Sequence, residues 1–190
     1  MTPTRTITVS HNAETAHRLF HTPGKCQRIH GHSYRIRLRL TGTVNAEGLL
    51  AGIDYGSLKQ SFRGFIDTYL DHHLLLNETD PFAGPLMAMA AGDEMRTDRL
   101  SLPGLRKCAG DPTTENLAMW IGEWAQAKLA VPGLFSVAVD VDETPSNAAG
   151  WSGGVNLLGV EQELTEVLGR LSPQHYRQVR LDDKIPGRDA

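Results

Sequence analysis

Two histidines separated by one glycine, His30 and His32, lie in the segment KCQRIHGHSY at residues 25–34. Side chains two positions apart on a strand point to the same side, so both imidazoles can converge on one ion. Five of the eight histidines fall between positions 11 and 32, which favours a site over scattered surface residues. A third ligand must come from elsewhere, and our choice is His17 in AETAHRL, just after the first expected strand. The spacing therefore predicts a metal site formed by these three histidines.

Two kinds of zinc site fit this spacing. Three neutral imidazoles with an open fourth position are typical of catalytic Zn²⁺, which acts as a Lewis acid on substrate oxygens. Cys26 could instead be the fourth ligand, which would give a closed, structural site. In the open site, Cys26 beside Lys25 would be a usable thiolate base. Three imidazoles also suit other first-row metals, so the identity of the metal stays open.

Two other places carry acidic residues in unusual positions. In LDHHLLLN, Asp71 precedes His72, and an aspartate beside a histidine can orient the ring and support its protonated form. The alternative is that the pair only caps a helix end. Glu143 ends the apolar face of a predicted strand, where a carboxylate is costly to bury without a partner. It either emerges at the rim of the sheet or awaits a ligand.

Hydrophobic periodicity predicts the elements that position these residues. Alternating apolar residues predict strands at 5–11, 32–41, 134–144 and, less regularly, 153–160. His30 and His32 have the same parity as the apolar face of the second of these strands. Apolar stripes predict a helix over 56–70 and another that begins at Asp111-Pro112 and ends before Pro132-Gly133. The order ββααββ predicts an α+β fold, a four-stranded antiparallel sheet with two helices on one face.

The remaining face of two strands is charged. Arginines at 35, 37 and 39 alternate with the apolar residues of the second strand, and aspartates at 140 and 142 do so in the third. These are either ordinary solvated faces or the polar inner wall of an oligomeric barrel.

Composition limits the class of protein. The chain has 190 residues, 40% hydrophobic and 22% charged, with a net charge of −3, as expected of a soluble globular protein. This charge gives no reason to expect nucleic acid or a membrane as a partner. The N-terminal residues MTPTRTITVS lack the apolar core of a signal peptide, which predicts a cytoplasmic protein. In that compartment Cys26 and Cys108 are expected to be free thiols.

Taken together, the motifs resemble the 6-pyruvoyltetrahydropterin synthase / 6-carboxytetrahydropterin synthase family. The motifs that match, in the family's order, are AETAHRL, CQRIHGHSY, IDYGSLK, LDHHLLLN, DPTTEN and DETPSN. The C-x3-HGH spacing is similar to the bacterial 6-carboxy-5,6,7,8-tetrahydropterin synthases of the queuosine pathway. The resemblance implies the tunnelling fold, in which trimers close a barrel and two trimers stack as a homohexamer with active sites between subunits.

The resemblance also implies roles for particular residues. By motif, His17, His30 and His32 would bind Zn²⁺, Cys26 would be the general base, and Asp71 with His72 would form a proton relay. Glu143 would anchor the pterin, whose adjacent N–H donors a carboxylate can accept in parallel. Thr113 and Thr114 would add polar contacts to the pterin, or would only cap the second helix.

The implied reaction converts 7,8-dihydroneopterin triphosphate to 6-carboxy-5,6,7,8-tetrahydropterin, acetaldehyde and triphosphate, in 7-deazaguanine (queuosine) biosynthesis. The alternatives are a 6-pyruvoyltetrahydropterin synthase or a related dihydropterin reaction, and, in another class, a non-catalytic pterin-binding or structural zinc protein. We expect one domain at 1–161, with an insertion at 79–110 between the helices that makes this segment much longer than in compact bacterial members of the family, and a C-terminal extension at 162–190.

Overall fold

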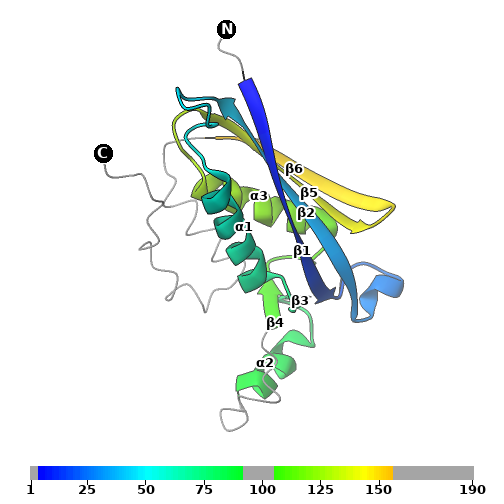
Figure 1. Ribbon diagram of the computed structural model, residues 1–190. Coiled ribbons are helices and arrows are strands. Elements are labelled where there is room, and N and C mark those ends of the chain that lie inside the picture. The colour runs from blue at the N-terminus through cyan, green and yellow to red at the C-terminus, as the bar shows by residue number, and fades with distance from the viewer. Residues whose placement is uncertain (1–3, 92–104, 156–190) are drawn as a thin grey trace.

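The computed structural model describes residues 4–91 and 105–155, and in them one six-stranded sheet has the order β4-β3-β1-β2-β5-β6 (Figure 1). The long strands are antiparallel neighbours: β1 (Thr4–His17), β2 (His30–Thr43), β5 (Leu134–Thr144) and β6 (Asn147–Gly154). Two short strands, β3 (Leu74–Asn77) and β4 (Leu105–Cys108), run parallel to the end of β1. The helices are α1 (Tyr55–Tyr69), α2 (Ala83–Ala91) and α3 (Thr114–Lys128), with a short 3-10 turn, η1, at Lys25–Gln27.

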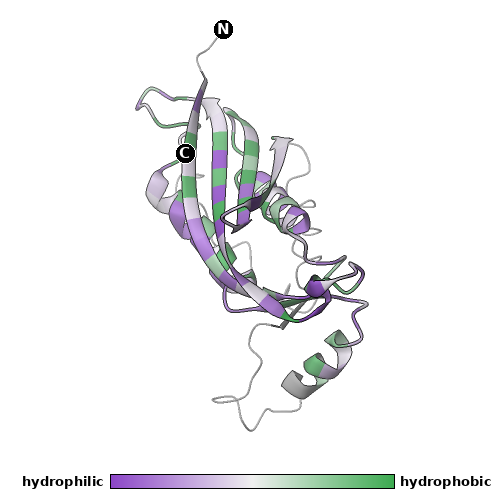
Figure 2. Cartoon of the chain, turned by 90° about the vertical axis from the view of Figure 1, so that its right-hand side faces the viewer, coloured by the Kyte–Doolittle hydropathy of each residue, from purple (hydrophilic) through white to green (hydrophobic). Residues whose placement is uncertain are grey.

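Helices α1 and α3 bury one face of this sheet. Residues that alternate along β2, such as Tyr34, Ile36 and Leu38, are at most 1% exposed. They pair with buried residues of β1 and β5, for example Leu38 with Val9 and with Val139. Figure 2 shows the resulting alternation of hydrophobic and hydrophilic bands along the strands. The core therefore lies between the sheet and the two helices, as the apolar stripes predict.

The opposite face carries paired charges. Arg37 donates to Asp142 at 2.9 Å, and Arg39 lies 3.1 Å from Asp140, both between β2 and β5. The arginine side chains are 41% and 48% exposed, so each pair stabilises the fold by at most about 1 kcal/mol. Opposite charges on adjacent strands nevertheless fit the strand register, which places Arg37 across from Asp140.

The α+β class is confirmed, but the four-stranded ββααββ plan is too simple. β3, α2 and β4 lie between the two predicted helices; α2 and β4 fall within 79–110, where an insertion was expected, and β3 precedes that segment. The predicted strand at 153–160 is wrong in its start, because β6 begins at Asn147 directly after the turn in DETPSN. Residues 92–104 of the predicted insertion, and 156–190 with the predicted C-terminal extension, lie outside the described residues.

Two β-bulges change which side chains of β5 face the core. Thr41 pairs with Ser136 and Gly42 with Leu134, so Phe135 is an extra residue in β5. Leu134 then takes the buried position, and Phe135, predicted on the apolar face, is 49% exposed. The second irregularity lies between Asp142 and Thr144 and makes Glu143 the extra residue there. Bulges re-aim side chains, often beside active sites.

Helix α3 packs closely on β6 at a glycine. A Cβ on Gly122 would lie 2.1 Å from Cε3 of Trp151, so only glycine leaves room for this indole. We expect Gly122→Ala to lower the free energy of unfolding by about 1–3 kcal/mol, because the ring must move out of its packed position. Gly64→Ala in α1 is the matched control: nothing lies within 4 Å of its Cβ, and alanine should stabilise the helix by about 0.5–1 kcal/mol. Urea unfolding of both variants measures this; an unchanged Gly122→Ala protein would contradict the packing.

None of the helices in the described ranges is long and apolar enough to cross a lipid bilayer.

Candidate metal centre

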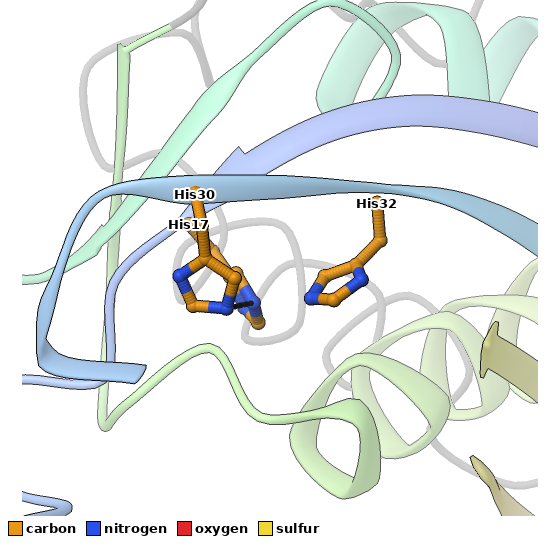
Figure 3. A group of neighbouring side chains, drawn as sticks. All are labelled: His17, His30 and His32. Atoms are coloured by element: carbon orange, nitrogen blue, oxygen red, sulfur yellow. Dashed lines mark hydrogen bonds between the residues drawn. The ribbon is translucent and has the colours of Figure 1, made fainter. Parts of the chain in front are cut away.

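Three imidazoles from two neighbouring strands converge at one end of the sheet. His17 is the last residue of β1 and pairs with His30, the first residue of β2; His32 follows on the same face of β2 (Figure 3). Their ligand nitrogens all lie within 4.8 Å of one another, and within the described residues this is the one group of three or more candidate metal ligands. The first strand continues to His17, six residues beyond its predicted end, and the strand pairing itself brings the third histidine to the other two.

The glycine between the two histidines of β2 has a backbone role. A Cβ on Gly31 would lie 3.1 Å from the carbonyl oxygen of Thr15 in β1, closer than most side chains approach. Glycine therefore allows β1 and β2 to come together at the position where His17 and His30 meet.

Backbone carbonyls fix the orientation of two of the rings. Nδ1 of His17 lies 2.8 Å from the carbonyl oxygen of Pro112, and Nδ1 of His30 lies 2.7 Å from that of Arg28. A carbonyl oxygen only accepts, so Nδ1 carries a hydrogen in each ring, and in the neutral form Nε2 presents a lone pair. The two Nε2 atoms are 3.1 Å apart (Figure 3), a separation that a shared proton or a metal ion beside both atoms can bridge.

This donor set fits a divalent metal. In a tetrahedral zinc site with Zn–N bonds of about 2.0–2.1 Å, neighbouring nitrogens are about 3.3 Å apart. The Nε2 atoms of His17 and His30 are close to that separation. Burial is the main cause that lowers the pKa of His17, and the neighbouring His30 and His32 lower it further. The hydrogen bond to the Pro112 carbonyl and the charge of Glu143 raise it, but by less, so the pKa is lowered overall. His17 is thereby kept neutral, the form in which imidazole binds a metal.

A carboxylate stands beside the three rings. Oε1 of Glu143 lies 3.7 Å from Nε2 of His32 and 4.0 Å from Nε2 of His17. Thr114, at the start of α3, donates from Oγ1 to the same carboxylate oxygen at 3.0 Å. Glu143 therefore does not simply emerge at the rim of the sheet. It continues the parity of the buried Val139 and Val141 and lies beside the three histidines, with its side chain 20% exposed.

The two threonines of DPTTEN have different environments. Thr113 is the N-cap of α3, and its hydroxyl accepts from the backbone N–H of Asn116. Of the two roles considered for Thr113, the structure therefore shows helix capping. Thr114 contacts Glu143 instead. The prediction that Asp111 caps the helix is wrong, because its carboxylate accepts from the backbone N–H of His21 and from the side chain of Asn77, both across the loop.

Sequence analysis overlooked two supporting residues. Tyr34 continues the face of His30 and His32, and its hydroxyl lies 3.3 Å from Nδ1 of His17. Burial, followed by the nearby charge of Glu143, raises the pKa of Tyr34. Asp111 holds the loop that presents the Pro112 carbonyl to His17. The parity of β2 could have indicated Tyr34, whereas nothing in the sequence pattern indicates Asp111.

Asp71 and His72 form a pair of their own beside β1. Oδ2 of Asp71 lies 2.7 Å from Nδ1 of His72, and Oδ1 accepts from the backbone N–H of Glu14. Burial alone would raise the pKa of Asp71. The hydrogen bonds from the backbone N–H of Glu14 and from His72 outweigh burial, so the pKa of Asp71 is lowered. His72 has a positive φ of 57° and a side chain that is 80% exposed. A non-glycine residue in this conformation is uncommon and is typical of sites under functional constraint.

The remaining candidate is Cys26. Cys26 is exposed in η1 and Cys108 is buried, and neither forms a disulfide bond, as predicted. Arg18, which follows His17, is paired with the buried Asp80 at 3.0 Å and lies 4.2 Å from the ring centroid of Phe82.

Comparison with known proteins agrees with the motifs. The family model described as 6-pyruvoyl tetrahydropterin synthase matches residues 6–153. A protein of Synechocystis sp. named 6-carboxy-5,6,7,8-tetrahydropterin synthase is 34% identical over 142 residues, which are 72% of this chain and 84% of that protein. One from Halobacterium salinarum, named as a probable enzyme of the same kind, is 33% identical over 137 residues, 70% of this chain and 77% of its own length.

Solved structures show the same fold. A catalytic residue mutant of 6-pyruvoyltetrahydropterin synthase from Plasmodium vivax superposes with a TM-score of 0.61 at 20% identity, over 80% of this chain and 99% of that one. An uncharacterized protein from Wolinella succinogenes gives 0.63, also at 20% identity, over 79% of this chain and 98% of that one.

Proposed function

The chain belongs to the 6-pyruvoyl tetrahydropterin synthase family, and we propose that it is a zinc-dependent carbon–carbon lyase. The proposed reaction converts 7,8-dihydroneopterin triphosphate and one water molecule to 6-carboxy-5,6,7,8-tetrahydropterin, acetaldehyde and triphosphate, in 7-deazaguanine (queuosine) biosynthesis in the cytoplasm. The observation that carries the proposal is the group of three imidazoles with converging Nε2 atoms beside the Glu143 carboxylate. The names of the most similar relatives favour this product over the 6-pyruvoyl compound.

The proposed metal ligands are His17, His30 and His32. A bound Zn²⁺ would act as a Lewis acid on the substrate's side-chain oxygens and so acidify the neighbouring C–H bonds. The Pro112 and Arg28 carbonyls keep two of the rings in the ligand tautomer and fix their orientation.

Glu143 is the proposed anchor for the pterin. The 2-amino-4-oxo ring presents adjacent N–H donors, and a carboxylate can accept two of them in parallel. Thr114 already donates to Oε1, and this contact fixes the plane of the carboxylate. Recognition of the ring at Glu143 would bring the substrate's side chain to the three histidines, because the carboxylate and the rings are neighbours.

Cys26 and the pair of Asp71 with His72 are the proposed proton-transfer groups. The Cys26 thiolate would remove a proton from the substrate's side chain, and His72, supported by the Asp71 carboxylate, would return one. The exposed thiol and the exposed imidazole are both accessible to a substrate.

We further propose a homohexamer of two stacked trimers, each closing a barrel. β6 is an edge strand, and β1 pairs with β3 only at Ala16 and His17, so most of β1 is a second edge in the described part of the chain. Edge strands are templates for pairing with another chain. The charged face that carries Arg37 and Asp142 would then line the barrel. The proposed domain is 1–161, with 79–110 as an insertion and 162–190 as an extension, and active sites between subunits would make an isolated subunit inactive.

A product assay tests the proposed reaction. Zinc-loaded protein is incubated with 7,8-dihydroneopterin triphosphate, and the pterins and acetaldehyde are measured together. We expect acetaldehyde and 6-carboxytetrahydropterin in equal amounts. Release of triphosphate with a 6-pyruvoyl product and no acetaldehyde would instead identify a 6-pyruvoyltetrahydropterin synthase. No turnover by a zinc-loaded hexamer would contradict both and favour a binding or structural role.

A further inference from the structure

The turn that carries Asp71 and His72 is held against the end of β1 (Figure 1). Residues 70–73 follow directly after α1, and residues 14–16 of β1 hydrogen-bond to them. Three of these bonds use only the backbone of β1, and they join the Glu14 carbonyl to the N–H of His72 at 2.7 Å, the Glu14 N–H to Oδ1 of Asp71 at 2.8 Å, and the Ala16 N–H to the His73 carbonyl at 2.9 Å. The end of β1 therefore restrains both partners of the Asp71–His72 pair.

Thr15 adds a contact from a side chain of β1. Its hydroxyl donates to the Leu70 carbonyl at 2.8 Å, at the point where α1 ends. Thr15 is 4% exposed and lies on the same buried face of β1 as Ala13 and His17. A β-branched side chain is stiff about its first side-chain bond, and burial restricts it further. The hydroxyl therefore fixes the Leu70 peptide plane from which the turn starts.

The backbone conformation of His72 depends on such contacts. Its φ is 57°, which is uncommon for a residue other than glycine and persists only where the surrounding structure determines it. In this conformation Nδ1 of His72 lies 2.7 Å from Oδ2 of Asp71. A carboxylate accepts hydrogen bonds, so Nδ1 carries the hydrogen. Nε2 of this largely exposed ring is then the atom that can exchange a proton with a substrate.

We propose that Thr15 is a positioning residue for the Asp71–His72 pair. By holding the Leu70 carbonyl, its hydroxyl fixes the turn that keeps Nδ1–H of His72 on Asp71 and leaves Nε2 for proton transfer. His17 follows two residues later, so the strand that supplies a metal ligand also positions the proton-transfer group. The inference rests on the proposed function, in which Asp71 and His72 transfer a proton, but not on the identity of the product.

The tautomer of the His72 ring tests this without any turnover. Solid-state NMR of zinc-loaded protein labelled with 15N-histidine distinguishes the two nitrogens of each ring, at alkaline pH where imidazole is neutral. Signals that are lost in His72→Gln belong to His72, and we expect the Nδ1–H form in the parent. Thr15→Val and Thr15→Ala both remove the hydroxyl and should convert part of His72 to the Nε2–H form, which predominates in free histidine. Thr15→Ser keeps the hydroxyl and should keep the parent's spectrum.

The variants that lack the hydroxyl are expected to fold, because the Leu70 carbonyl also accepts from the N–H of His73 at 3.2 Å. They should keep one zinc per chain, while kcat falls at least about tenfold with KM nearly unchanged, since a misplacement of about 1 Å can cost about 100-fold. Thr43→Val is the matched control. The Thr43 hydroxyl also donates to a backbone carbonyl, that of Gly133 at the other end of β2, so its loss should alter neither the His72 spectrum nor kcat.

The parent's tautomer in both Thr15→Val and Thr15→Ala would overturn the inference, even if kcat fell, because Thr15 would then have only a structural role. A parent in which His72 has the Nε2–H form would overturn it as well. If the zinc-loaded parent does not turn over the dihydropterin, the proposed function fails, while the tautomers of the parent and the variants still decide whether Thr15 holds the Asp71–His72 pair.

Discussion

His30→Ala is expected to abolish stoichiometric metal binding and, with it, turnover. The ring supplies one of three nitrogen ligands, and its Nε2 lies 3.1 Å from that of His17. Loss of an outer-shell partner alone lowers metal affinity about 10–100-fold, so removal of a ligand should lower it by at least about 100-fold. Zinc content after dialysis against a competing chelator measures this, and zinc should no longer raise the thermal midpoint of the variant.

A histidine outside the cluster provides the control. His11 pairs with Asp67 at 2.8 Å, so His11→Ala should keep one zinc per chain at the parent's affinity. A His30→Ala protein that also kept zinc at that affinity would show that the three converging imidazoles are not the metal site.

Cys26→Ala is expected to keep its metal and lose most of its turnover. Under the proposal Cys26 is a base rather than a ligand, and a positioned base contributes about 10²–10⁴-fold to the rate. Zinc content and steady-state rates on the same preparations measure the two effects separately. If the variant lost its zinc, the closed site with four ligands would be correct and the enzyme assignment would fail.

Alkylation of the unmodified chain gives an independent view of the same residue. Cys26 is exposed and Cys108 is 2% exposed, so iodoacetamide should react at Cys26. We expect the reaction to proceed in the zinc-loaded protein, whereas a zinc ligand would be protected until the metal is removed.

Local pattern was sufficient for the main elements of the fold. The strict alternation from His30 to Leu40 predicted both the strand and the buried side of its two histidines, because one face of β2 packs on the helices throughout. The apolar stripe of α1 was equally clear, and its buried residues are the predicted ones. Such patterns can be recognised in the sequence when each helix or strand buries a single face, because its apolar residues then recur with the period of that element.

Tertiary pairing determined what the pattern could not show. The second half of β1, NAETAH, contains alanine and glutamate, which have little preference for strands, and it is extended because all of it pairs with β2. The four-residue strand at LLLN is too short to be distinguished from the end of a helix.

The candidate site was also predicted only in part. The spacing of His30 and His32 indicated a metal site, and the register of β1 and β2 brings the predicted third ligand, His17, beside them. Glu143 continues the parity of Val139 and Val141, so periodicity indicated it, whereas the position of Asp111 depends on a loop that crosses to His21 and does not follow from periodicity. The residues alone left Cys26 open as a base or a zinc ligand, and Asp71 with His72 open as a supported imidazole or a helix cap, and the resemblance to the family then favoured the catalytic roles.

X-ray absorption at the zinc edge of the loaded protein tests the central claim most directly. The account predicts three imidazole nitrogens and one further light atom, all at about 2.0–2.1 Å, and no sulfur. A sulfur neighbour at about 2.3 Å would identify Cys26 as a ligand in a closed structural site, and would contradict the open metal centre on which the proposed lyase depends.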